Sequence, residues 1–150
     1  MPVTLEEIDH ARWARDAQAV ADLARIYQDA PSNRLPLAID DFVRTHLESG
    51  GTFCCALFND RLLGAVRVSK DADAWWLSHF CVRKTTRRRG VGSRLLALVA
   101  ETARDRNSAL RVEASHLHME DQLLLTRLGY RLEVNGSYFE LNPLASGGCQ

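Results

Sequence analysis

A short basic run with two glycines has the residue types needed to bind an anion: Arg87-Arg88-Arg89-Gly90-Val91-Gly92-Ser93. If a helix begins here, its first N–H groups have no internal acceptor, and together with the helix dipole they attract negative charge. Gly90 and Gly92 have no side chains, so phosphate oxygens can approach the main chain closely. The arginines add positive charge, and Ser93 adds a hydroxyl donor. These residues therefore predict a site for a ligand that carries phosphate groups.

The segments on both sides of this run must position it. Residues 75–82 before it are apolar and strand-like, and after it Val91, Leu95 and Val99 recur at helical spacing. A solvated basic turn before an ordinary helix is the alternative, and the glycine spacing alone does not decide, because short motifs recur by chance. The strand before the run and the helix after it favour the ligand site.

The remaining pattern indicates a mixed sheet flanked by helices. Val20, Leu23, Ala24 and Tyr27 share one helical face, and a second such face lies within residues 39–46. Pro36 suits the first turn of that second helix, and Gly50-Gly51 ends it. Asn59-Asp60 and Asn135-Gly136 join pairs of strands, the latter as a strong hairpin signal. We expect strands at 3–8, 52–58, 62–68, 75–82, 110–114, 130–134 and 137–141, and further helices at 91–104 and 120–128.

Length and composition limit the function classes. A chain of 150 residues with 46% hydrophobic content suits one domain over residues 1–150, with residues 144–150 as a disordered tail. A net charge of zero argues against general binding of nucleic acid. The sequence has neither a signal-like leader nor an apolar run long enough to span a membrane. Its four cysteines have no regular spacing, which is typical of reduced thiols in a cytoplasmic protein.

The segment from Val82 to Leu96 resembles the coenzyme A-binding motif of the GNAT family of N-acetyltransferases. That motif is Gln or Arg, two residues, Gly, one residue, and Gly or Ala, and Arg87, Gly90 and Gly92 match it. The step Leu128-Gly129-Tyr130 also looks like a step typical of the family. The resemblance covers residues 52–141. It implies the α/β (α+β) GNAT fold, with a mixed, mostly antiparallel central sheet of about six to seven strands and about four flanking helices.

The resemblance also implies a cofactor, acetyl-coenzyme A, and the residues that bind it. Main-chain groups of the basic run would hold the pyrophosphate, and the end of the preceding strand would hold the pantetheine arm. The expected cofactor-binding residues are Phe80, Cys81, Val82, Arg87, Arg88, Arg89, Gly90, Val91, Gly92 and Ser93.

Acetyl transfer to an amine needs a base for the amine and an acid for the departing thiolate. His79, on the strand at 75–82, has an ordinary pKa that suits a general base, and Glu113 on the adjoining strand is a second candidate. A structural role is the alternative for both. Many GNAT members have a tyrosine as the acid where this chain has Leu125. His116 and His118 could bind a metal, but they have no third ligand, so no metal is expected.

Two functions follow from these resemblances. The main expectation is an N-acetyltransferase that acts on an amine of a small molecule or peptide, as a monomer or homodimer. The alternative comes from residues 58–68 and 86–92, which are similar to the PanZ (PanM) family. This implies an acetyl-coenzyme A-dependent regulator whose partner is the aspartate decarboxylase proenzyme, with little or no transferase activity. Residues 36–51 favour the enzyme, since they predict a helix that the PanZ family is expected to lack.

Overall fold

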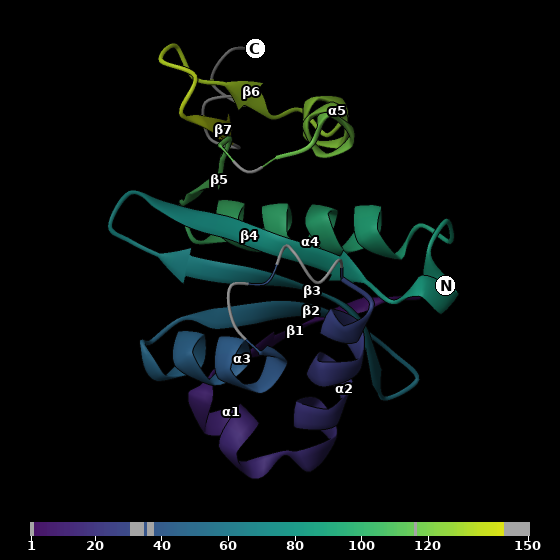
Figure 1. Cartoon of the computed structure of the whole chain (residues 1–150). Coiled ribbons are helices and arrows are strands. Elements are labelled where there is room, and N and C mark those ends of the chain that lie inside the picture. Colours follow the sequence, from purple (N-terminus) through teal and green to yellow (C-terminus); the bar gives the residue numbers. More distant parts are fainter. Residues whose placement is uncertain (1, 31–34, 36–37, 116, 143–150) are drawn as a thin grey trace. The chain divides into compact units, whose positions relative to one another are not determined.

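The computed structural model of the chain describes residues 2–30, 35, 38–115 and 117–142, which belong to two compact units (Figure 1). The first unit comprises Met1–Ser69 with His79–Val99, and the second comprises Lys70–Ser78 with Ala100–Gln150. The expectations for Pro36, for His116 and for a disordered tail at 144–150 fall outside the described residues. The expectation of one domain over residues 1–150 stays a prediction.

The first unit combines helices with four neighbouring strands of the sheet, in the order β1-β2-β3-β4. Strand β2 pairs antiparallel with both β1 and β3. The predicted strands and the helices at 20–27, 39–46 and 91–104 are confirmed. The elements are β1 (Thr4–Ile8), α1 (His10–Arg15), α2 (Ala17–Gln28), α3 (Ile39–Glu48), β2 (Thr52–Phe58), β3 (Arg61–Lys70), β4 (Ala74–Val82), η2 (Lys84–Thr86) and α4 (Val91–Asp105).

Helix α1 was not predicted, and its existence follows from two aspartates. The Asp9 carboxylate accepts the N–H of Arg12 at 2.8 Å and so caps α1. Asp16 has extended backbone angles that end α1, and its carboxylate accepts the N–H of Ala19 at 3.1 Å, which caps α2. The Arg12 guanidinium bonds Asp16 at 2.8 Å. This hydrogen bond lowers the pKa of Asp16.

The core of the first unit lies where α2 and α3 pack on the strands. Tyr27, Phe42 and Phe53 meet edge to face, with ring centroids 5.2 to 5.9 Å apart. The buried face of α2 differs from the predicted one, because Val20 and Ala24 are only partly buried. The side chains that α2 buries are those of Ala19, Asp22, Leu23, Ile26 and Tyr27.

Both faces of β2 and β3 are covered. Cys54 and Cys55 are fully buried although consecutive strand residues point to opposite faces. Cys55 belongs to the core cluster with α2 and α3. On the other face Leu95 of α4 lies next to Gly64, since a Cβ added there would be in ordinary contact with it at 3.7 Å. The cysteines of the described residues form no disulfide.

The second unit contains the strand order β4-β5-β7-β6, so that the seven strands form one mixed, mostly antiparallel sheet. Strand β4 pairs parallel with β5 from Ala74↔Ala109 to Leu77↔Val112, and β7 pairs antiparallel with β5 and β6. The closing hairpin is confirmed, although its first strand is shorter than predicted. The elements are β5 (Ala109–Glu113), α5 (Met119–Arg127), β6 (Arg131–Leu132) and β7 (Tyr138–Leu141).

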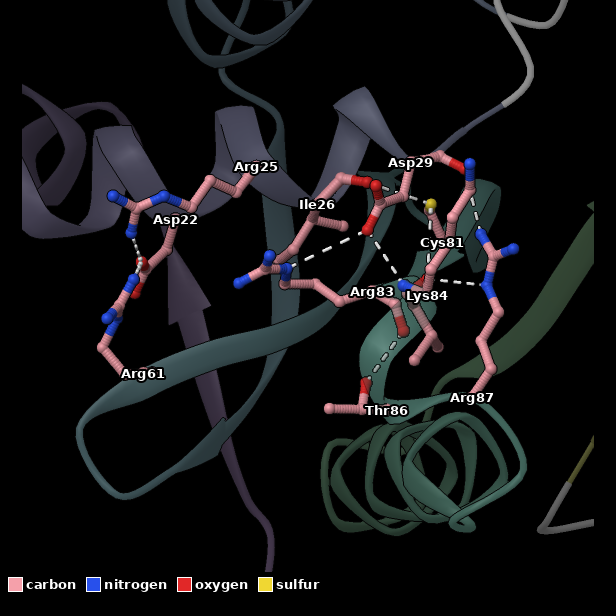
Figure 2. Close-up of polar contacts among 11 residues, drawn as sticks. Asp22, Arg25, Ile26, Asp29, Arg61, Cys81, Arg83, Lys84, Thr86 and Arg87 are labelled. Carbon is pink, nitrogen blue, oxygen red and sulfur yellow. Dashed lines mark hydrogen bonds and ion pairs between the residues drawn. The ribbon is translucent and has the colours of Figure 1, made fainter.

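A buried carboxylate fixes α2 against the turn between β2 and β3. Asp22 is 2% exposed, and its Oδ1 accepts two bonds from Arg61, at 2.9 and 3.0 Å (Figure 2). Its Oδ2 accepts the N–H of Leu62 at 3.0 Å, and Gln18 donates to Oδ1 at 2.9 Å. A buried charge is tolerated only when it is paired and hydrogen-bonded, and Asp22 meets both conditions.

The substitution Asp22→Ala is expected to lower the free energy of unfolding by about 2–3 kcal/mol, because the buried N–H of Leu62 loses its acceptor. Urea denaturation measures this loss. Asp22→Asn is the matched control, since its amide oxygen can still accept that N–H, and it should lose less. A change below about 0.5 kcal/mol in Asp22→Ala, as for an ordinary surface position, would contradict this account.

A buried histidine connects α3 with β2 and β3. The Nε2 atom of His46 lies 2.9 Å from the carbonyl oxygen of Thr52 and 3.0 Å from that of Val68, so Nε2 carries the proton and donates. Its Nδ1 is buried with no hydrogen-bond partner among the described residues. Burial lowers the pKa of His46. The neutral ring is therefore the form that fits.

Acid is expected to weaken the fold through His46. Its pKa in the folded chain is below the unfolded value of about 6.5, so between these two values the unfolded chain binds more protons. Stability is therefore complete above about pH 6.5 and falls as the pH drops toward the folded pKa. Urea denaturation of the wild type and of His46→Gln from about pH 7.5 to 5.5 tests this. The stability difference between them should shrink with acidification, and a constant difference would rule the mechanism out.

Candidate coenzyme-binding site

The basic run forms a turn that ends in the first turn of α4. Arg88 and Gly90 have left-handed backbone angles, with φ of 67° and 79°. The first bond of the helix runs from the N–H of Arg94 to the carbonyl of Gly90, at 3.0 Å. The N–H groups of residues 91–93 precede this bond and have no acceptor within the helix. Because Arg88 and Arg89 are exposed beside these amides, the turn can hold an anion.

The two glycines serve different purposes. A Cβ at Gly92 would lie 2.8 Å from Cζ of Phe80 and 3.2 Å from Cγ2 of Val82, so Gly92 lets α4 approach β4. A Cβ at Gly90 would have nothing within 4 Å, but the φ of 79° there favours glycine. The side chains of Phe80 and Val82 thus support the loop. Whether the backbone of Phe80, Cys81 and Val82 holds a pantetheine arm stays a prediction.

The side chain of Arg87 faces the protein. Its Nε donates to the carbonyl of Val82 at 3.0 Å, and its Nη2 donates to the carbonyl of Asp29 at 3.0 Å (Figure 2). Arg87 therefore anchors the loop to the end of β4 and to the end of α2. The guanidinium groups left to face a ligand are those of Arg88 and Arg89. Sequence reasoning missed Asp29, which no local pattern marks.

His79 lies at an irregularity of β4. Its φ is 51°, which is rare for a residue with a side chain and is often found at functional sites. The hydroxyl of Tyr27 donates to the carbonyl of His79 at 2.8 Å, and the His79 ring is 4.9 Å from that of Phe42. Strand β4 is paired with β5 only as far as Leu77. The half-buried His79 is thus held by α2 and α3, and its role as a base stays a prediction.

The other catalytic expectations fall in the second unit. Glu113 is exposed at the end of β5, and its carboxylate accepts the hydroxyl of Ser115 at 3.0 Å. His79 belongs to the first unit, and the role of Glu113 also stays a prediction. Leu125 is buried on α5. The nearby hydroxyl of Tyr130 is buried, and burial raises its pKa.

The described residues contain no group of three or more His, Cys, Asp or Glu side chains that could hold a metal ion. Within the same residues, no helix is both long and apolar enough to cross a membrane.

The fold is that of known acetyltransferases. A GNAT-family acetyltransferase from Desulfovibrio desulfuricans has a TM-score of 0.71 at 15% identity, over 94% of this chain and 99% of that one. A GNAT-family acetyltransferase from Elizabethkingia anophelis, with acetyl-CoA bound, has a TM-score of 0.64 at 17% identity, over 87% of this chain and 77% of that one. Likeness at this level of identity defines the fold alone. The chain has the GNAT fold, as the sequence predicts.

Similarity in sequence is more specific. The profile of the family described as "Acetyltransferase (GNAT) domain, PanZ" matches residues 3–127. The PanD regulatory factor of Salmonella typhimurium strain LT2 is 30% identical over 140 residues, which cover 91% of this chain and 97% of that relative. The chain belongs to the PanZ family. Helix α3 lies inside the matched region, so the helix expected within residues 36–51 does not set the chain apart from this family.

The substitution Gly92→Val is expected to abolish binding of acetyl-coenzyme A, because the new side chain would meet Phe80 and Val82 and push α4 away from β4. Calorimetric titration measures the binding. Gly136→Ala is the control, since this glycine also has a positive φ, of 78°, but lies in the hairpin between β6 and β7. Its backbone strain should cost stability without changing the affinity. Unchanged affinity in Gly92→Val would show that the loop is an ordinary turn.

Proposed function

We propose that this chain is an acetyl-coenzyme A-dependent regulator of the maturation of the aspartate decarboxylase proenzyme, with little or no transferase activity. Membership of the PanZ family carries the proposal. A relative that matches nearly end to end is named for regulation of PanD. Sequence reasoning placed the N-acetyltransferase first and this regulator second. The comparisons reverse that order.

The proposed ligand is acetyl-coenzyme A. The amides of residues 91–93, which have no acceptor within the helix, and the exposed Arg88 and Arg89 suit a pyrophosphate group. Two proteins with the same fold support this ligand: the Elizabethkingia anophelis acetyltransferase with acetyl-CoA bound, and the PaiA N-acetyltransferase of Thermoplasma acidophilum in complex with coenzyme A. A regulator needs more than binding, because a ligand shifts a conformational equilibrium only through a difference in affinity. We therefore expect the acetylated form to bind the active state more tightly than free coenzyme A does.

The environment of Leu125 supports little or no transfer. Many GNAT members have a tyrosine at this position to protonate the departing thiolate, whereas here a buried leucine occupies it. Tyr130 follows closely, but its buried hydroxyl has a raised pKa and no hydrogen-bond partner among the described residues. Neither residue offers an accessible acid. N-acetyltransferase activity remains the second candidate, because the unusual backbone of His79 on β4 is of the kind found at reactive sites.

A reconstituted maturation reaction separates the two candidates. The purified chain and the proenzyme from the same organism are mixed with acetyl-coenzyme A, with coenzyme A, or with neither, and proenzyme cleavage is followed over time. We expect the chain to accelerate cleavage only with acetyl-coenzyme A. The variant Arg88→Ala/Arg89→Ala should need more of the ligand, and the difference should be larger at low salt.

Release of free thiol is measured in parallel with a panel of amine acceptors. His79→Ala is the control, since it should leave the regulation of cleavage intact if no transfer is involved. Rapid thiol release that depends on His79, together with cleavage that is indifferent to the chain, would establish the transferase and overturn the regulator.

A further inference from the structure

Asp29 connects the end of α2 to the coenzyme loop, which comprises residues 83–93 between β4 and the first turn of α4. It is the C-terminal cap of α2, where its own N–H bonds to the carbonyl groups of the last turn. Its carboxylate Oδ2 accepts the N–H of Lys84 at 2.9 Å. Its carbonyl oxygen accepts a bond from the guanidinium of Arg87 at 3.0 Å. The two contacts lie at the two ends of η2, and Figure 2 shows them converging on Asp29.

Asp29 also balances charge where the loop begins. The Nε of Arg83 lies 3.9 Å from the Asp29 carboxylate, and this nitrogen is buried with no hydrogen-bond partner among the described residues. Arg83 is followed by a run of cations that repel one another, at positions 84 and 87–89. The bond from the N–H of Lys84 to Asp29 fixes the start of this run, and it needs an acceptor at position 29 rather than a charge.

The last turn of α2 is further bonded to β4. The hydroxyl of Tyr27 donates to the carbonyl of His79 at 2.8 Å, and the thiol of Cys81 donates to the carbonyl of Ile26 at 3.2 Å. This turn of helix therefore contacts both the strand and the loop that follows it. A rigid base of this kind can hold the loop in position.

We propose that Asp29 is a positioning residue for the coenzyme loop. It holds Lys84 and Arg87 so that the amides of residues 91–93 converge before the ligand arrives. The proposal rests on the proposed role of this loop in binding acetyl-coenzyme A. Positioning by Asp29 differs from a direct effect of its charge on the ligand, because a carboxylate near the site repels a pyrophosphate group. Positioning and bare electrostatics therefore predict opposite signs when the carboxylate is removed.

Two substitutions separate these effects. Asp29→Ala removes the charge and the acceptor for the N–H of Lys84, whereas Asp29→Asn removes the charge and keeps an acceptor. Glu48→Ala is the matched control, since it deletes an equal charge on α3 whose partner is Arg44. Affinity for acetyl-coenzyme A is measured by calorimetry at about 0.05 M and about 0.5 M salt. Hydrogen exchange of the Lys84 amide is measured without ligand.

We expect Asp29→Ala to weaken binding about tenfold at both salt concentrations, the effect of losing one hydrogen bond that holds the loop. Its Lys84 amide should exchange faster than in the wild type. Asp29→Asn should restore both the affinity and the slow exchange, with an affinity equal to or higher than that of the wild type at low salt. Glu48→Ala should behave as the wild type in both measurements.

Several results would overturn the proposal. The proposal fails if Asp29→Ala folds and binds as tightly as the wild type, or if Asp29→Asn loses as much affinity as Asp29→Ala. Thermal unfolding shows whether Asp29→Ala folds. If it does not fold, the result for Asp29→Asn decides, because an affinity of Asp29→Asn below that of Glu48→Ala contradicts positioning. If the wild type binds no acetyl-coenzyme A, the proposed function fails. Exchange at Lys84 then still decides whether Asp29 holds the loop, and equal exchange rates in the wild type and Asp29→Ala would refute that.

Discussion

The first turn of α4 can approach β4 only because residue 92 has no side chain. Phe80 and Val82 fill the space that a Cβ would need, and this close contact determines where the helix begins. The amides of residues 91–93, which have no acceptor within the helix, then follow directly after the exposed Arg88 and Arg89 in the chain. The geometry of the candidate site thus depends on steric fit between a strand and a helix, and the basic side chains would act on a geometry that packing has already established.

Polar side chains fix the positions of the helices, which burial of the apolar core alone does not specify. The cluster between the strands and helices α2 and α3 gives most of the driving force, but apolar burial has no direction. Asp22 and His46 supply the direction, because each bonds main-chain groups of the strands on which its helix packs. Asp29 has the same relation to the loop after β4. Each of these side chains bonds a main-chain group of a strand or of the loop, so each fixes one position of a helix against the segment on which it packs.

Local signals in the sequence predicted most of the fold, including the glycine turn that leads from β4 into α4. Strand alternation, the hairpin at Asn135-Gly136 and the glycine run depend on neighbouring residues, so they are visible without a structure. The predicted buried face of α2 shares Leu23 and Tyr27 with the observed one. It misses the charged Asp22, because the partner of this residue, Arg61, is distant in the sequence. Asp29 was missed for the same reason. The comparisons support the regulator better than the enzyme that the sequence placed first, since a motif for binding the coenzyme does not distinguish a regulator from a catalyst.

The close approach of His46 to residue 51 links the substitutions that these two positions can accept. A Cβ at Gly51 would lie 2.0 Å from the imidazole ring, so the ring and a side chain at 51 exclude each other. A lineage that keeps the histidine must keep the glycine, and a lineage that shortens the histidine becomes free to vary the glycine. The two sites should therefore drift as a pair during evolution, with the change at 46 preceding the change at 51.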